Sequence, residues 1–239
     1  EIIRLGAEEG QPGLHLKVDP LGAVVTCLSL NGQDILYPRQ EVETLDGAKK
    51  LRGGMHVCSP WFGPDPENNG PQHGFARDEQ WEIIDLDKDS IRLGLSGVEG
   101  WSHLEQTIVY GVNPNLQVFW ASLRLMKMGD LTRMVSPGFH PYFNRLAEAK
   151  AWTSGMTTEK RNEAPVRGKG KKLETPLRLS TNPGAPGINV IMGGVGTQKR
   201  VYWTDDPGYG CVEPVADARD LQPGGSMTIS MTIQATLAN

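Results

Sequence analysis

Cysteine is scarce in this sequence of 239 residues, which contains three, Cys27, Cys58 and Cys211. None of them forms a Cys-x-x-Cys pair, and an odd number cannot be fully paired within one chain. The sequence therefore disfavours a disulfide-stapled scaffold. Reduced thiols are typical of the cytoplasm, where we expect the protein to be located.

Long apolar runs are also missing. No stretch approaches the roughly 18 residues that a membrane-spanning helix needs, and the first residues do not resemble a signal peptide. The formal net charge of −4 disfavours general binding to nucleic acid or to an anionic membrane. We expect a monomer that acts on a small molecule, with no nucleic-acid or membrane partner.

Common cofactor and nucleophile motifs are absent from the sequence. It has no Gly-x-Ser-x-Gly and no phosphate-binding loop, and Gly193-Gly-Val-Gly196 lacks the spacing of a dinucleotide fingerprint. His56 and Cys58 are potential metal ligands, but no second such pair lies nearby. We therefore predict no cofactor and no metal. A metal-dependent enzyme that uses His56, Cys58 and His73 is kept as an alternative.

The sequence has little that predicts helices and much that predicts strands. Apolar residues alternate with polar ones in short runs, most clearly from Met227 to Leu237, as in a half-buried strand. Turn residues separate the runs, and the chain has 29 glycines and 17 prolines. The other predicted strands are Leu14–Val18, Ala23–Leu30, Trp81–Leu86, Ile91–Leu95, Leu104–Tyr110 and Leu116–Leu125. This pattern predicts an all-β antiparallel sandwich or barrel, formed by residues 1–239 as one domain.

The segment from Arg52 to Trp81 is dense in ionisable side chains and in residues with special backbone properties. It contains two arginines, two histidines and five glycines, and we predict a strand-poor loop system. Such loops often carry binding and catalytic groups. Arg52 and Arg77 are either surface residues or a phosphate or carboxylate site, since guanidinium binds such oxygens bidentately. His73 is followed by Gly74, which permits close approach of a ligand.

His140 lies in the aromatic motif Phe-His-Pro-Tyr-Phe. The following proline favours an extended conformation at His140. The aromatic rings could pack against the C–H face of a sugar, or they could form a core cluster around a structural histidine. Both interpretations fit the local sequence.

Glu213 interrupts the apolar run Gly-Cys-Val-Glu-Pro-Val. On a strand it shares a face with Cys211, while Val212 points to the other face. A carboxylate in apolar surroundings suits a general base, whereas an unpartnered one is seldom buried. Pro214 predicts the end or an edge of this strand.

Together these motifs resemble the galactose mutarotase-like superfamily, and most closely its hexose-6-phosphate mutarotase (glucose-6-phosphate 1-epimerase) branch. The motifs that carry the resemblance lie in the family's order, from about residue 15 onward. They are Arg52-Gly-Gly, Cys58-Ser-Pro-Trp-Phe-Gly63, Pro71-Gln-His-Gly-Phe-Ala-Arg77, His140-Pro-Tyr-Phe143 and Cys211-Val-Glu213.

The resemblance implies a large twisted antiparallel β-sandwich with an active site on a concave sheet face. It implies metal-free interconversion of the α and β anomers of an aldose, a sugar or sugar phosphate. In that reaction Glu213 is the base, His140 the acid, and His73 binds and polarises sugar oxygens. Arg52 and Arg77 resemble the arginines that hold the 6-phosphate.

The chain also departs from the family pattern between Phe143 and Val201, where it is shorter. A sugar-binding aspartate expected in that interval has no clear match, and Asp205 and Asp206 are substitute candidates. Because of this shortening, a non-catalytic carbohydrate-binding domain on the same scaffold is the alternative function.

Overall fold

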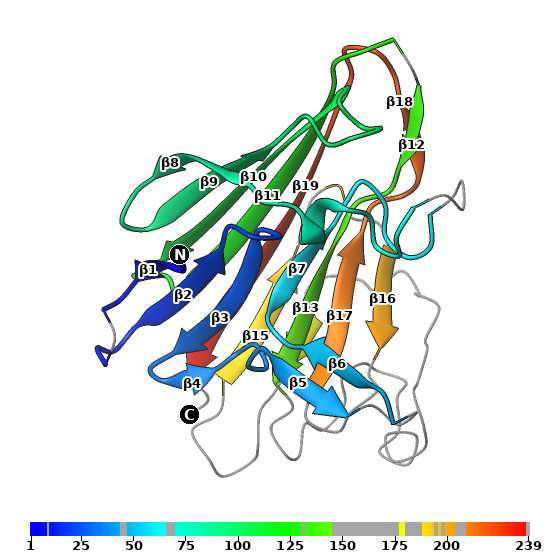
Figure 1. Cartoon of the computed structure of the whole chain (residues 1–239). Coiled ribbons are helices and arrows are strands. Elements are labelled where there is room, and N and C mark those ends of the chain that lie inside the picture. Colours follow the sequence, from blue (N-terminus) through cyan, green and yellow to red (C-terminus); the bar gives the residue numbers. More distant parts are fainter. Residues whose placement is uncertain are drawn as a thin grey trace.

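The computed structural model describes residues 1–8, 10–43, 47–65, 70–130, 132–144, 177–179, 188–193, 196, 199–203 and 209–237. The regular secondary structure of these residues is nearly all strand, with one short 3-10 helix, η1 (Ala76–Asp78) (Figure 1). In the described part of the chain, no helix is long and apolar enough to cross a membrane. The assignment of residues 1–239 to one domain stays a prediction, and so do the monomeric state and the cytoplasmic location.

Two large antiparallel sheets make up the fold. The first has the order β1-β2-β3-β7-β13-β17-β16, with β4 added on β3, and the second has the order β14-β15-β19-β11-β10-β9-β8. The strands of the first sheet are β1 (Ile3–Gly6), β2 (Leu14–Asp19), β3 (Val24–Leu30), β4 (Gln33–Asp34), β7 (Met55–Cys58), β13 (Gly138–Asn144), β16 (Lys199–Trp203) and β17 (Tyr209–Val215). Those of the second are β8 (Glu82–Leu86), β9 (Ser90–Leu95), β10 (Leu104–Asn113), β11 (Val118–Lys127), β14 (Leu177–Leu179), β15 (Ile188–Gly193) and β19 (Ser226–Leu237).

Two small strand pairs complete the described structure. The hairpin of β5 (Gln40–Glu43) and β6 (Lys49–Arg52) lies beside the first sheet, and β12 (Arg133–Val135) pairs with β18 (Arg219–Leu221). The predicted all-β antiparallel sandwich is confirmed.

The core lies between the two large sheets. Alternate residues of β19, from Met227 to Ala235, are buried there, as the period-two pattern predicted. They join buried residues of β10 and β11 and the inward residues of β2, Leu14, Leu16 and Val18, in one cluster. Burial of this apolar surface is the main favourable contribution to the stability of such a sandwich.

The central strands of the first sheet are buried on both faces, which positions the candidate site. On β13, Phe139 and Phe143 belong to the main core, whereas Tyr142 belongs to a separate cluster with Tyr209 and Cys211. Because side chains alternate along a strand, His140 shares the face of Tyr142, which points away from the second sheet. We call this the outer face.

The segment from Arg52 to Trp81 is strand-poor, as predicted, but it contains β7, a central strand of the first sheet. One prediction about these strands was wrong. Pro214 does not end or edge β17, which continues to Val215 between two partner strands. β13 and β17 pair at Gly138 and again from Tyr142 to Asn144, but the residues between these two stretches form no pairs. Pro141 and Pro214 lie in that gap, where neither can donate an amide hydrogen bond.

A tight turn and two backbone hydrogen bonds hold the loop that carries His73 against the residues that follow β7. Both His73 and Gly74 have left-handed backbone angles, with φ of 70° and 73°. The His73 amide donates to the Gly63 carbonyl at 2.6 Å, and the Ala76 amide donates to the Ser59 carbonyl at 3.2 Å. A Cβ atom added at Gly74 would collide with that Ser59 carbonyl. Glycine at this position therefore allows the loop to lie against the sheet.

We predict that Gly74→Ala lowers the free energy of unfolding by about 3–5 kcal/mol, since it adds a backbone collision to left-handed strain. The matched control is Gly32→Ala, where φ is 78° and an added Cβ meets nothing within 4 Å. Strain alone should then cost about 1–2 kcal/mol. Urea denaturation of both variants measures the difference, and equal losses would contradict the role given to the Ser59 contact.

Candidate active site

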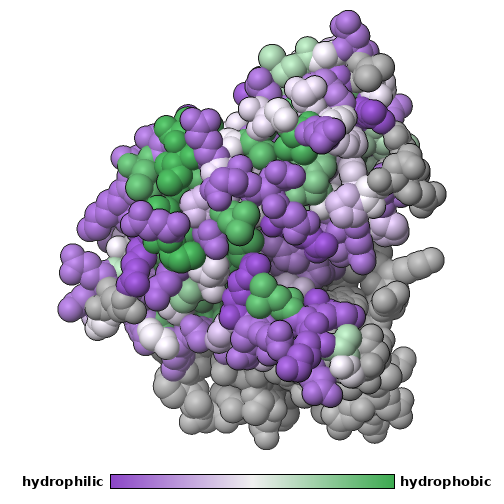
Figure 2. Space-filling view, viewed as in Figure 1, coloured by the Kyte–Doolittle hydropathy of each residue, from purple (hydrophilic) through white to green (hydrophobic). Residues whose placement is uncertain are grey.

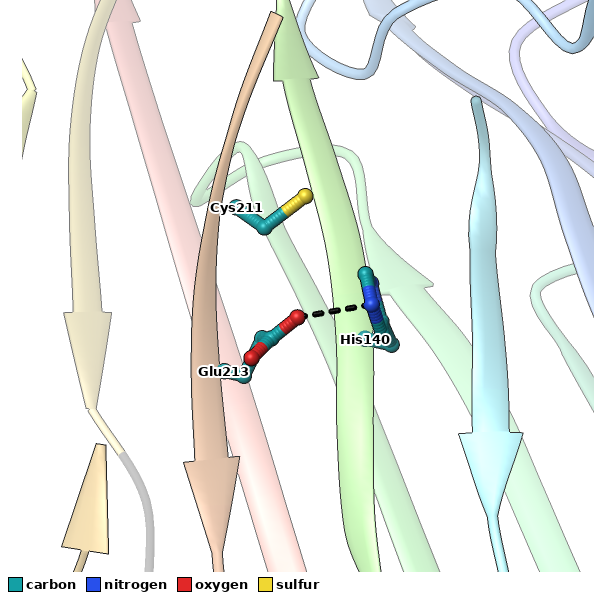
Figure 3. Close-up of side chains that lie close together, drawn as sticks. All are labelled: His140, Cys211 and Glu213. Carbon is teal, nitrogen blue, oxygen red and sulfur yellow. Dashed lines mark ion pairs between the residues drawn. The ribbon is translucent and has the colours of Figure 1, made fainter. Parts of the chain in front are cut away.

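A histidine and a glutamate face each other at the centre of the outer face. Gly138 pairs with Val215 and Tyr142 pairs with Cys211, so His140 on β13 stands opposite Glu213 on β17. Their side chains point toward one another, with 2.7 Å between His140 Nε2 and Glu213 Oε1 (Figure 3). Their exposed fractions are 5% and 2%. This is a buried, hydrogen-bonded acid–base pair formed by two neighbouring strands.

The pairing gives the buried carboxylate the partner that it requires. An isolated buried charge is strongly unfavourable, and a short hydrogen bond to imidazole offsets part of that cost. The bond uses Oε1, so Glu213 also has a second carboxylate oxygen to offer a ligand. His140 has both kinds of neighbour that its local sequence suggested, an ionisable partner in Glu213 and an aromatic ring in Tyr142, so its role as the acid stays a prediction.

His73 lies beside this pair, on the loop after β7. Its surroundings determine both the charge of the ring and which ring nitrogen carries the hydrogen. The Gly63 amide donates to His73 Nδ1 at 3.2 Å, and Cys58 Sγ lies 3.4 Å from the same nitrogen. Burial, with the nearby charges of His140, Arg77 and Arg52, lowers the pKa of His73 to about 3. The neutral ring therefore carries its hydrogen on Nε2 and can donate it to a ligand.

Aromatic contacts hold the rings of the site in place. The His73 ring meets His140 edge-on, with centroids 5.4 Å apart, and meets Phe62 edge-on at 4.8 Å. The His140 ring stacks on Tyr142 at 4.7 Å. Such ring pairs contribute packing energy and restrict side-chain rotation, so the acid–base groups are oriented before any ligand binds.

His56 is the site residue that the sequence did not assign to sugar chemistry. It lies directly opposite His140 in the pairing of β7 with β13. The two rings stack, with centroids 4.6 Å apart. Its spacing from Cys58 was interpreted only as that of two potential metal ligands, although the same spacing on a strand also places both side chains on the outer face.

The two predicted arginines lie near the histidines. Arg52 ends β6 and Arg77 lies in η1, and both are half-buried. Arg77 Nε is 3.6 Å from Asp78 Oδ2. The charges of both arginines help to lower the pKa of His73. Arg39, which the sequence did not single out, helps to lower the pKa of His56.

Hydrophilic residues gather over the part of the first sheet that holds these groups. Figure 2 shows them above the β5–β6 hairpin, where Figure 1 places β7, β13 and β17. The candidate aspartates Asp205 and Asp206 lie outside the described residues, as does most of the interval from Phe143 to Val201.

The potential metal ligands of the site were also considered. Within the described ranges, three such ligand atoms converge at His140, Cys211 and Glu213, within 4.8 Å of one another, and not at His56, Cys58 and His73. Zinc ligands about 2.1 Å from the ion in tetrahedral geometry stand about 3.4 Å apart. The 2.7 Å between His140 and Glu213 is instead a hydrogen-bond distance. The geometry therefore favours proton transfer.

The lowered pKa of His73 predicts a pH-dependent stability. Between its ordinary value of 6.5 and about 3, the unfolded chain binds a proton at His73 that the folded protein does not. Stability should therefore fall as the pH decreases through this window, by up to about 1.4 kcal/mol per pH unit.

The comparison variant is His73→Asn, because asparagine tolerates the left-handed backbone and can accept from the Gly63 amide without titrating. Urea unfolding of both proteins between about pH 7 and pH 4.5 measures the effect. The stability advantage of the natural chain should shrink toward low pH. Parallel profiles would contradict a neutral His73.

Comparisons with known proteins identify the family of this chain. Residues 8–190 match the family model described as Aldose 1-epimerase. A candidate glucose-6-phosphate 1-epimerase of Escherichia coli (strain K12) is 41% identical over 46 residues, which are 19% of this chain and 16% of that protein. One of Salmonella typhimurium is 52% identical over 33 residues, 14% of this chain and 11% of that protein. The matched stretches thus span less than a fifth of these curated relatives.

Solved structures show the same fold over the whole chain. A protein of Synechocystis sp. PCC 6803 superposes with a TM-score of 0.79 at 22% identity, covering 100% of this chain and 96% of the other. A candidate aldose 1-epimerase of Escherichia coli K12 gives 0.78 at 16% identity, covering 100% and 99%. With the family match over residues 8–190, these findings confirm the resemblance of the motifs, and the chain belongs to the aldose 1-epimerase family.

Proposed function

We propose that this chain interconverts the α and β anomers of a hexose or hexose 6-phosphate by opening and reclosing the sugar ring. The observation that carries the proposal is the buried hydrogen bond of 2.7 Å between His140 and Glu213. It unites a proton donor and a proton acceptor beside the neutral donor His73. Membership of the aldose 1-epimerase family supports the same class of enzyme, an isomerase.

Ring opening requires one proton to leave the C1 hydroxyl and one to reach the ring oxygen O5. Glu213 takes the proton from O1, and His140 gives its proton to O5 as the C1–O5 bond breaks. An open-chain aldehyde results. Each such transfer by a positioned group contributes about 10²–10⁴-fold to the rate.

Reclosure reverses these transfers on the other face of the aldehyde. Rotation about C1–C2 presents that face to O5, which attacks C1 and returns its proton to His140, while Glu213 returns its proton to O1. Both groups recover their starting states, so the cycle is balanced by these two residues. His73 Nε2 donates to a sugar oxygen and orients the ring between the two groups.

The finer proposal is that Arg52 and Arg77 bind the 6-phosphate of the sugar. Both are half-buried beside the histidines, and guanidinium groups bind phosphate through paired N–H donors. The names of the relatives matched over short stretches point to the same substrate class.

We predict that Glu213→Gln lowers the rate of anomer equilibration by about 10²–10⁴-fold, because glutamine cannot accept the O1 proton. Polarimetry or proton NMR of fresh α-glucose 6-phosphate and α-galactose measures the rate. Glu82→Gln, at an exposed position on β8, is the matched control and should keep the natural rate. Circular dichroism checks that both variants fold.

If the Glu213→Gln variant equilibrates the anomers at the natural rate, Glu213 is not the base. Saturable sugar binding by the natural chain without faster equilibration would instead favour the non-catalytic carbohydrate-binding domain.

We predict that Arg77→Ala raises KM for glucose 6-phosphate by about 10–100-fold, the loss expected for a hydrogen bond to a charged group. The KM for unphosphorylated glucose should change little. Arg92→Ala, on the exposed side of β9, is the control for removing one positive charge. Equal effects of Arg77→Ala on both sugars would rule out the phosphate role.

A further inference from the structure

His56 Nε2, on the outer face, is buried and makes no hydrogen bond within the part of the chain that the structure describes. A buried polar atom without a partner costs about 1–3 kcal/mol. Most buried polar atoms in folded proteins have a hydrogen-bond partner, so each one without a partner calls for an explanation, of which a functional role is one.

The position of His56 relative to the acid–base pair is defined by strand register. His56 on β7 pairs with His140 on β13, which stands opposite Glu213 on β17. The three side chains form one row across neighbouring strands, spaced by about 4.8 Å. His56 therefore occupies the side of His140 that is remote from Glu213.

The surroundings of His56 keep its ring uncharged. Burial lowers its pKa well below the ordinary value, and the charges of His140, Arg77, His73 and Arg39 act in the same direction. A neutral imidazole has one donor and one acceptor nitrogen. It is therefore suited to an oxygen that can both accept and donate, such as a sugar hydroxyl.

The order of atoms in a pyranose matches the order of the row. O1 and the ring oxygen O5 are both bonded to C1, and C5, on the far side of O5, carries C6 and its oxygen O6. If Glu213 accepts the proton of O1 and His140 donates a proton to O5, then His56, the next residue in the row, lies at the C6 end of the sugar. The positive charge of Arg77 acts on His56 as well as on His73, as expected where a 6-phosphate would follow O6.

We propose that His56 binds O6 of the substrate and thereby makes the site selective for hexoses over pentoses. This inference rests on the proposed function. The oxygen concerned is the same atom in a hexose and in its 6-phosphate, whereas a pentopyranose such as xylose lacks C6 and leaves His56 without a partner. A site built to bond a substrate oxygen discriminates strongly against the analogue without it.

The test compares His56→Phe and the natural chain on glucose, glucose 6-phosphate and xylose. Phenylalanine keeps a flat ring that can stack on His140 but has no hydrogen-bonding nitrogen. We expect kcat/KM to fall about 10–100-fold for both hexoses and to change less than threefold for xylose. His56→Gln, which can still bond O6, should restore part of the hexose rate. Thermal unfolding of each variant shows whether it folds.

A fall by the same factor on all three sugars would overturn the inference, since it would show that His56 only orients His140. A second measurement does not depend on turnover. In nitrogen-15 NMR of the natural chain, the His56 Nε2 resonance should shift on adding glucose 6-phosphate and not on adding xylose. Equal shifts or no shift would also overturn it, whereas failure of the proposed function would appear separately as no anomerisation of any sugar by the natural chain.

Discussion

The site depends on one electrostatic requirement, which is that the carboxylate of Glu213 is buried and must have a partner. His140 supplies it at 2.7 Å, and this contact exists only in the observed register of β13 and β17. A slip by one residue would turn His140 into the main core and bring Phe139 or Pro141 to the outer face. The core packing of Phe139 and Phe143 therefore stabilises the register that the chemistry needs.

Three histidines lie close together near Arg52 and Arg77, and these groups cannot all be protonated at such short range. Burial and neighbouring positive charges keep His56 and His73 neutral. His140 alone among them hydrogen-bonds a carboxylate in the described structure. In the proposed mechanism His140 therefore exchanges a proton with the sugar, while His56 and His73 donate or accept hydrogen bonds as neutral rings.

The strands and the loop position the side chains of the site in different ways. The strands place His56, His140 and Glu213 by backbone register, which permits little displacement. The loop places His73 by a left-handed turn, by the packing of Gly74 against Ser59 and by the bond from the Gly63 amide. The arginines lie at the margin of this rigid centre, in β6 and η1, where half-exposed side chains can meet a charged group that remains partly in water.

The sequence by itself predicted the all-β class and the main strands, because period-two alternation is a local signal. It also singled out Glu213, His140, His73, Arg52 and Arg77 as candidates, whose roles are implied by the resemblance of their motifs to a family. It could not show that Pro214 lies inside a central strand, since the gap there depends on Pro141 in a partner strand 73 positions earlier in the numbering. Nor could it show that His56 faces His140. Only the tertiary structure decided which residues stand opposite one another, because register between distant strands is fixed by packing of the whole core rather than by any short stretch of chain.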